Sequence, residues 1–206
     1  MSEAFLLTPL EQDALTELFN IGVGYAASAM NELLNEELRL SVPSIEVLPR
    51  QSLSDALQLQ SKSICGVHQS VSGLFSANAH LLFPEDESLE LVKLMLGESV
   101  PHNTLTEMQQ EALCEIGNII LNACVGAMAN TMENECHASL PSLFRGSMEQ
   151  VLGYSEQGGE DLSLVIFIDF LAEKRQIRGY LVFLLDTISL VDLKAVLGAF
   201  LEKIGA

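Results

Sequence analysis

Several residue types that would narrow the function of this 206-residue chain are scarce or missing. It has no tryptophan and only 10 lysine and arginine residues against 28 aspartate and glutamate residues, which gives a formal net charge of −18. Nucleic acids and anionic membrane surfaces bind proteins through lysine and arginine. The charge balance therefore disfavours both as partners, and we expect a protein partner instead.

Signals for metal sites, disulfides and familiar catalytic centres are also missing. Cys65, Cys114, Cys124 and Cys136 form no CxxC pair, and the neighbouring Cys136 and His137 lack a second pair at ligand spacing. We predict no metal site, no cofactor of the chain's own, and four reduced cysteines that act as small hydrophobic residues. The sequence contains no glycine-rich phosphate loop, GxSxG or HExxH motif. A self-contained catalytic centre is therefore not expected.

The hydrophobic content nevertheless predicts a folded core. Hydrophobic residues make up 49% of the chain, which excludes a disordered protein. No apolar run approaches the roughly 20 residues that a membrane-spanning helix needs. The amino terminus, MSEAFLLTPLEQD, lacks the charged region and long apolar core of a signal peptide. We expect a soluble cytoplasmic protein that makes no membrane contact.

One arrangement of four residues occurs twice with identical spacing. It reads acidic-x3-Glu-x2-Asn-x22-Pro. The two copies are Asp13, Glu17, Asn20 and Pro43, and then Glu111, Glu115, Asn118 and Pro141. Further residues match at the same offset of 98, and an offset of 101 aligns the segments that close each half; the glycine-rich segment 153–161 absorbs the difference. We predict a single domain, 1–206, made of two repeats at about 1–98 and 99–206.

Each half has the same predicted order of elements. A long helix opens on a capping box, Thr8 with Glu11 and Thr106 with Gln109, and runs to about Asn35 or Glu133. Strands are expected at 44–48, 63–72 and 74–83, then at 143–152, 162–170 and 176–185, with closing helices at 85–96 and 187–201. We predict an α+β fold in which two pseudo-twofold α-β-β-β-α units share one mostly antiparallel six-stranded sheet flanked by helices.

Helical spacing places the Glu and Asn of each copy on one face. At 100° per residue, Asp13, Asn20 and Gly24 lie within about 60° of Glu17. In the second helix Glu111, Asn118, Asn122 and Gly126 group around Glu115 in the same way. The core-facing stripe of the first helix is predicted to contain Ala14, Leu18, Ile21, Tyr25 and Ala29.

A single ExxN pattern would indicate only an ordinary solvated helix face, but its duplication favours a function. Gly24 and Gly126 strengthen this view, because glycine inside a helix costs about 1 kcal/mol and a flat landing surface would explain it. Close packing of the two long helices on these glycines is the alternative. Pro43 and Pro141 are interpreted as structural markers that end the connection to the first strand.

The duplicated pattern resembles the signature of the CheC/CheX/FliY family of bacterial chemotaxis phosphatases, Asp/Ser-x3-Glu-x2-Asn-x22-Pro. The first copy fits it fully, and the second departs from it only in Glu111 at the first place. Two intact motifs resemble the CheC branch rather than CheX, which has one. The sequence shows no rotor-type domain after the second repeat, in contrast to FliY.

The resemblance implies dephosphorylation of the phosphorylated response regulator CheY by a monomeric enzyme. Glu17 or Glu115 would pair with the active-site lysine of the receiver domain. Asn20 or Asn118 would orient the attacking water at the acyl phosphate, with Mg²⁺ held by the receiver rather than by this chain. Contacts with the partner are expected at Asp13, Gly24, Glu111 and Asn122. For Asp13 and Glu111 the alternative is a favourable interaction with the positive start of the helix.

Two noncatalytic alternatives remain open. The same face could hold a phosphorylated receiver without hydrolysing it, or another surface could bind the deamidase CheD, so that the chain acts as an adaptor. The fold could also serve as a structural module of the flagellar switch related to the FliM middle domain, which lacks the Glu/Asn motif. The intact motifs favour catalysis over both.

Overall fold

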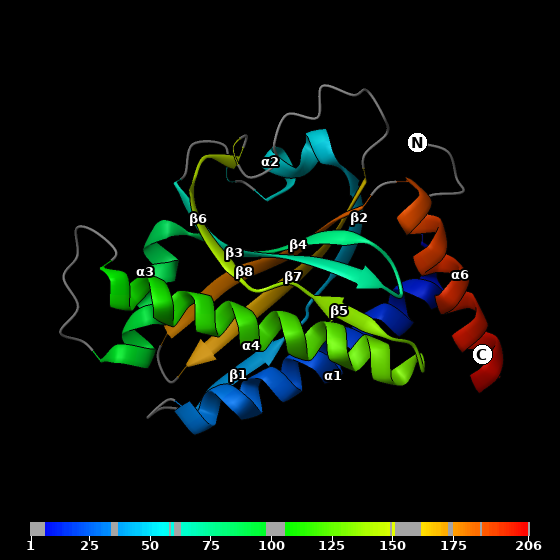
Figure 1. Cartoon of the computed structure of the whole chain (residues 1–206), viewed down its shortest axis with the longest axis horizontal. Helices are drawn as coiled ribbons and strands as arrows, with labels where there is room; N and C mark the ends of the chain where they lie inside the picture. The colour runs from blue at the N-terminus through cyan, green and yellow to red at the C-terminus, as the bar shows by residue number, and fades with distance from the viewer. Residues whose placement is uncertain are drawn as a thin grey trace.

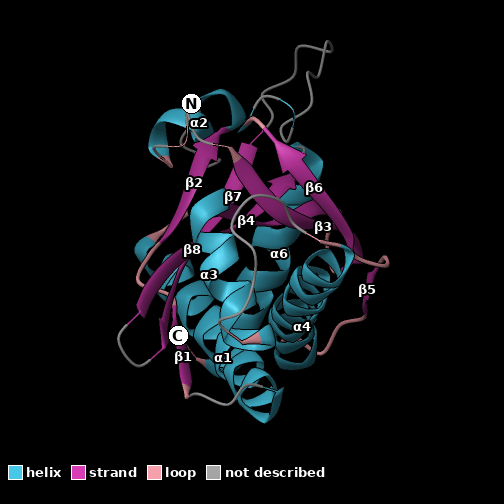
Figure 2. Ribbon diagram, turned by 90° about the vertical axis from the view of Figure 1, so that its left-hand side faces the viewer, coloured by secondary structure: helices cyan, strands magenta, loops and turns pink. Residues whose placement is uncertain are grey.

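Two long helices lie side by side beneath one curled sheet (Figures 1 and 2). The computed structural model describes residues 7–33, 37–57, 59, 63–97, 106–148, 150, 162–172, 175–185 and 187–205. The helices are α1 (Pro9–Leu33) and α4 (Glu107–Thr131), and Figure 1 shows that they run in opposite directions. Their direction matters for function, because each carries one copy of the duplicated motif in its first half.

The described residues form an eight-stranded antiparallel sheet. Its strands are β1 (Leu38–Ser41), β2 (Ile45–Pro49), β3 (Ile64–Gly73), β4 (Ala77–Pro84), β5 (Cys136–Ala138), β6 (Ser142–Gly146), β7 (Leu162–Ala172) and β8 (Arg175–Leu185). Their order is β1-β7-β8-β4-β3-β5, with β2 also on β7 and β6 also on β3. If β1 to β4 are exchanged with β5 to β8, the same order is obtained from the opposite edge of the sheet. This symmetry is compatible with two repeats. The duplication itself stays a prediction.

The predicted class of mixed helices and antiparallel sheet is confirmed, but the predicted number of six strands is wrong. The extra strands β1 and β5 have only four and three residues, too few for an alternating pattern to mark them. The predicted strand 143–152 ends at Gly146. Segment 153–161, predicted as a loop, lies outside the described residues.

The helices agree closely with their predicted limits. Both capping boxes form: Thr106 N donates to Gln109 Oε1 at 2.7 Å, and Thr8 N donates to Glu11 Oε2 at 2.7 Å. α4 ends two residues before Glu133, and α1 is described to Leu33. The closing helices are α3 (Glu85–Leu96) and α6 (Thr187–Ile204), and a short 3-10 turn η2 (Arg50–Ser52) with α2 (Leu53–Ala56) was not predicted.

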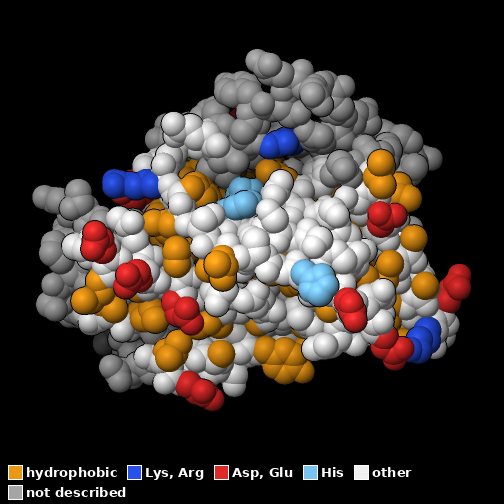
Figure 3. All heavy atoms as spheres, viewed as in Figure 1, with side chains coloured by type: hydrophobic (Ala, Val, Ile, Leu, Met, Phe, Trp, Pro, Cys, Tyr) orange, Lys and Arg blue, Asp and Glu red, His pale blue; other side chains and the backbone are white. Residues whose placement is uncertain are grey.

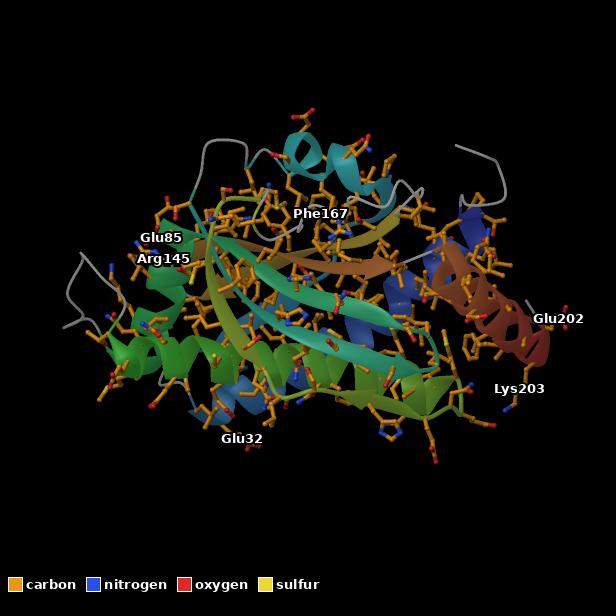
Figure 4. The ribbon with its side chains drawn as sticks, turned by 45° about the horizontal axis from the view of Figure 1, so that its top comes forward. Glu32, Glu85, Arg145, Phe167, Glu202 and Lys203 are labelled. Atoms are coloured by element: carbon orange, nitrogen blue, oxygen red, sulfur yellow. The ribbon has the colours of Figure 1, made fainter. Side chains whose placement is uncertain are left out.

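Apolar side chains fill both faces of the sheet. The larger core lies between the sheet and helices α1, α3, α4 and α6, and includes the fully buried Phe19 and Phe183, whose ring centroids are 5.8 Å apart. A smaller cluster under α2 covers the opposite face, where Phe167 packs edge-on against Tyr180 (Figure 4). An ion pair between Arg145 on β6 and Glu85 at the start of α3 joins sheet and helix (Figure 4).

The core-facing side of α1 differs from the predicted stripe. Its buried residues are Leu15, Leu18, Phe19, Gly22, Val23, Ala26 and Met30. Of the predicted stripe only Leu18 is buried, and Tyr25 is 63% exposed. At 100° per residue the observed stripe is centred roughly 180° from Glu17. Glu17 therefore points further from the core than predicted.

Helix α4 is long and apolar enough to span a membrane by length and composition, with a mean hydropathy of 1.6 in its most apolar window. However, 61% of that window is buried inside the protein. Ile116, Ile120 and Cys124 are at most 1% exposed. The core accounts for the apolar character of this helix.

Candidate functional site

Glu17 and Glu115 are both exposed and have no charged partner among the described residues. Each lies in the first half of its helix. Neither carboxylate makes a hydrogen bond or ion pair with any described residue. A carboxylate in this state can form a charge-assisted hydrogen bond with an incoming ammonium group without first breaking another bond.

The side chain of Asn20 is half-buried and fixed by the backbone. Its Oδ1 accepts a hydrogen bond from Val42 N at 3.0 Å. A backbone N–H can only donate, so the oxygen of the amide must face Val42 and the NH₂ group must face away from it. This NH₂ group has no hydrogen-bond partner among the described residues.

The contact with Val42 explains the distance between Asn20 and Pro43 in the motif. Val42 is the residue directly before Pro43, and a residue before proline is restricted to extended backbone. Pro43 therefore helps to hold the Val42 N–H in place, which agrees with a structural role for this proline.

The side chain of Asn118 is fixed by side chains instead. Its Oδ1 accepts hydrogen bonds from Asn122 Nδ2 at 2.8 Å and from Gln69 Nε2 at 3.4 Å. Gln69 Nε2 also donates to the backbone oxygen of Ser139 at 2.8 Å. Because that oxygen can only accept, Gln69 presents nitrogen and Asn118 must present oxygen. The NH₂ group of Asn118 again has no partner among the described residues.

The two Glu/Asn pairs share an exposed carboxylate and an amide held through its oxygen, but different donors hold the two amides. Because α1 and α4 are antiparallel (Figure 1), the two Glu/Asn pairs lie toward opposite ends of the helix pair. Gly22 lies where the helices touch, and a Cβ placed there would come within 2.7 Å of Cys124 Cα. Each site therefore stands on a helix that the core holds firmly.

The predicted landing-surface glycines do not pack the two helices together. A Cβ at Gly24 or at Gly126 would meet nothing within 4 Å. The close approaches occur at Gly22 and at Gly117, where a Cβ would come within 2.5 Å of Val67 Cβ. The packing alternative for Gly24 and Gly126 is wrong, and both positions border open space.

Other predicted site residues lie near the pairs. Asp13 and Glu111 are exposed one turn before Glu17 and Glu115, Pro43 is exposed and Pro141 is half-buried. Asn122 is exposed as well, and its bond to Asn118 gives it a role in holding that amide in addition to any contact with a partner.

Two residues near the second site were not predicted. Gln69 is only 1% exposed and lies on the helix side of β3, where a glutamine among apolar residues was the available signal. Leu140 is 89% exposed directly before Pro141, although the residue before Pro43 is buried. The sequence alone does not predict that this leucine is exposed, since leucine is usually buried.

The four cysteine thiols and the His80 imidazole are all shifted toward their neutral forms by burial, as the direction of each pKa change shows. Among the described residues no cluster of three or more His, Cys, Asp and Glu side chains could hold a metal ion. All four cysteines are free, and burial raises the pKa of Cys65 to about 11 and that of Cys124 to about 12. Burial and the neighbouring His68 and Arg50 lower the pKa of His80 to about 3.

The surface around the helices is strongly acidic. Acidic side chains are spread over the face that Figure 3 shows, and basic side chains are few. The net charge of −18 explains this pattern.

Sequence comparison connects the chain to chemotaxis phosphatases. Residues 10–47 match the CheC-like family, and residues 63–159 match the chemotaxis phosphatase CheX. The chain is 24% identical over 199 residues to the CheY-P phosphatase CheC of Bacillus subtilis, which covers 93% of this chain and 95% of that protein. It is 25% identical over 157 residues to the flagellar motor switch phosphatase FliY of B. subtilis, which covers 75% of this chain but only 39% of FliY.

Solved structures show the same fold. The crystal structure of Thermotoga maritima FliY matches with a TM-score of 0.78 at 17% identity, over 94% of this chain and 98% of that one. The FliM middle domain from H. pylori matches at 0.66, with 10% identity over 93% and 99%. CheX in the CheX–CheY–BeF₃–Mg²⁺ complex from Borrelia burgdorferi matches at 0.50, with 16% identity over 82% and 97%. The predicted resemblance to the CheC/CheX/FliY family is confirmed.

Proposed function

From this kinship with the CheC/CheX/FliY family, we propose that the chain is a cytoplasmic phosphatase that hydrolyses the aspartyl phosphate of a CheY-like response regulator. The observation that carries the proposal is the state of the two Asn side chains. In each, the oxygen is held by an internal donor, and among the described residues neither the NH₂ group nor the carboxylate one helical turn away has a partner. Relatives named CheY-P phosphatase support the same conclusion.

Glu17 and Glu115 serve as anchors for the partner. The receiver's active-site lysine pairs with one of these carboxylates through a charge-assisted hydrogen bond. This contact brings the neighbouring Asn to the acyl phosphate. Long-range repulsion between acidic surfaces does not prevent the encounter, because charges are screened beyond about 8 Å at physiological salt. Binding is expected to be weak and transient.

Asn20 and Asn118 position the attacking water. The amide NH₂ donates a hydrogen bond to one lone pair of the water, and the other lone pair attacks phosphorus. The bond between phosphorus and the aspartyl oxygen breaks, which releases inorganic phosphate and a free carboxylate. Mg²⁺ held by the receiver neutralises charge on the phosphoryl oxygens, so the missing component is a positioned water rather than a strong base.

The internal hydrogen bonds make this arrangement effective. With Oδ1 tied to Val42 N, the Asn20 side chain cannot turn its oxygen toward the phosphate without losing that bond. The NH₂ group is thus oriented before the partner arrives, and little rotational freedom is lost on binding. One chain then carries two such sites and is expected to work as a monomer.

A noncatalytic module is the second candidate, because the fold is also that of the FliM middle domain. A switch component or an adaptor for phosphorylated CheY or for CheD would need only a docking surface. Such a role does not explain why both sites combine a free carboxylate with an oriented amide. Catalysis accounts for both.

The test is phosphate release from phosphorylated CheY with the unmodified protein and its site variants. We expect the unmodified protein to accelerate release. Glu17→Ala/Asn20→Ala and Glu115→Ala/Asn118→Ala should each remove part of the activity, and the quadruple variant nearly all of it. Undiminished hydrolysis by the quadruple variant would reject these sites. Binding without acceleration by the unmodified protein would support the adaptor.

A further inference from the structure

We propose that Gln69 is a positioning residue of the second site, which holds the Asn118 amide with its NH₂ group toward the partner. The inference rests on the proposed function, because it assigns to Gln69 a part in the same hydrolysis. It also makes the two sites unequal: the second depends on a side chain of β3, and the first does not.

The hydrogen bonds of Gln69 link strand, loop and helix. Its Nε2 donates to the backbone oxygen of Ser139 at 2.8 Å and to Asn118 Oδ1 at 3.4 Å. The bond to Ser139 fixes which end of the glutamine amide is nitrogen. This in turn fixes which end of Asn118 faces inward. Asn122 also donates to Asn118 Oδ1, but it is exposed and can bond to water instead.

The oxygen of the Gln69 amide indicates that this glutamine does not by itself stabilise the folded protein. Gln69 is 1% exposed, and its buried Oε1 has no hydrogen-bond partner among the described residues. A buried acceptor without a partner destabilises the folded protein, and an apolar side chain of similar size would avoid that cost. The role of this glutamine therefore lies with its nitrogen, which joins the backbone oxygen of Ser139 to Asn118 and so holds the Asn118 amide.

Among the described residues, no side chain supports Asn20 at the first site in the way that Gln69 supports Asn118. Ile45 on β2 pairs with Ile166, and Leu143, which matches Ile45 at the repeat offset of 98, pairs with Val67. Val67 on β3 and Ile166 on β7 therefore occupy equivalent positions. Two residues further along these strands, Gln69 and Ile168 are equivalent. Ile168 is fully buried and has no donor, and Asn20 is instead held by Val42 N. The position that supports the second amide is therefore apolar in the first half.

The experiment uses two single-site proteins. The second-site protein carries Glu17→Ala/Asn20→Ala, and the first-site protein carries Glu115→Ala/Asn118→Ala. Gln69→Met is introduced into each, because methionine has a similar volume but no donor. Gln109→Met is the matched control: Gln109 is also a buried glutamine, 2% exposed, and its side chain caps the α4 amino terminus rather than contacting Asn118.

In the second-site protein, Gln69→Met should lower kcat for release of phosphate from phosphorylated CheY by about 3- to 10-fold, the effect of one lost neutral hydrogen bond. KM should stay within about twofold, because Glu115 still anchors the partner. Gln69→Met should leave the first-site protein unchanged, and Gln109→Met should leave kcat of the second-site protein unchanged. An unchanged kcat with Gln69→Met in the second-site protein, or equal losses in both proteins, would overturn the proposal.

A second measurement separates this proposal from the proposed function. The side-chain ¹H–¹⁵N signals of Asn118, assigned by their loss in Asn118→Ala, should move toward those of a free asparagine in Gln69→Met but not in Gln109→Met. If neither single-site protein hydrolyses the acyl phosphate, the proposed function fails at these sites, while this shift still tests the placement of Asn118. Signals that do not change with Gln69→Met would refute the positioning role.

Discussion

Replacing Gly22 or Gly24 by alanine should change the free energy of unfolding in opposite directions, although the two glycines are only two residues apart on α1. At Gly22 a Cβ would come within 2.7 Å of Cys124 Cα and 3.2 Å of Ala123 O, both backbone atoms of α4 that cannot turn aside. At Gly24 a Cβ would meet nothing within 4 Å. Gly22→Ala should therefore push the two helices apart, and Gly24→Ala should not.

The magnitudes follow from two terms. Alanine in place of glycine stabilises a helix interior by about 0.5–1 kcal/mol. Overpacking a tight contact costs about 1–3 kcal/mol. Gly24→Ala should raise the free energy of unfolding by about 0.5–1 kcal/mol, whereas Gly22→Ala should lower it by a net amount of about 1–2 kcal/mol. For a chain of this size, 1 kcal/mol corresponds to about 2–4 °C in Tm.

Urea and thermal unfolding of the two variants measure these changes. Activity adds a second readout, because a methyl group at Gly24 would stand on the surface proposed to meet the receiver. Gly24→Ala should therefore raise KM at the first site even though it stabilises the fold. The packing argument is refuted if Gly22→Ala is as stable as the unmodified protein, or if Gly24→Ala is destabilised to the same degree.

Three further predictions concern other parts of the structure. Leu140→Ser should change the free energy of unfolding by less than about 0.5 kcal/mol, as expected for an exposed side chain, but raise KM about 3- to 10-fold at the second site if the partner covers this leucine; unchanged kinetics in the second-site protein would exclude the contact. The pKa of His80 is about 3 in the folded protein against 6.5 for an ordinary histidine, so the unfolded chain binds a proton that the folded one does not, and stability should fall by up to about 1.4 kcal/mol per unit as pH drops below 6.5. Urea unfolding at pH 7.5 and 5.5 checks this, and His80→Gln should show a smaller pH dependence. A thiol reagent at pH 8 should label Cys114 before Cys124, because burial raises the pKa of Cys124 to about 12; mass spectrometry that finds Cys124 labelled first would contradict the described core.

The sequence predicted the helices and longer strands well because each has a local signal. The capping boxes at Thr8 and Thr106 mark helix starts, and runs rich in β-branched and aromatic residues mark β7 and β8. The short strands β1 and β5 have no such pattern, since three or four residues gain their structure from pairing with β7 and β3. Strand count therefore required tertiary information.

The site shows the same division between local and long-range information. Spacing alone predicted Glu17 and Asn20 on the same side of α1, because they are one turn apart on a helix, but it did not predict that Asn20 is half-buried against Val42. The core stripe was misplaced because α1 carries alanines and aromatic residues on several sides, and only contact with α4 and the sheet decides which side is buried. Gln69 lies 49 residues from Asn118, and no pattern along the chain could pair them.

The most direct test of the central claim separates the amide from the carboxylate. The Asn20→Ala/Asn118→Ala variant should bind a CheY-like receiver activated with beryllofluoride within about threefold of the unmodified affinity, but hydrolyse its acyl phosphate at least about 100-fold more slowly, as when a single positioned donor is removed from an active site. Glu17→Ala/Glu115→Ala should instead weaken binding itself. Hydrolysis by the double-Asn variant at close to the unmodified rate would contradict the account.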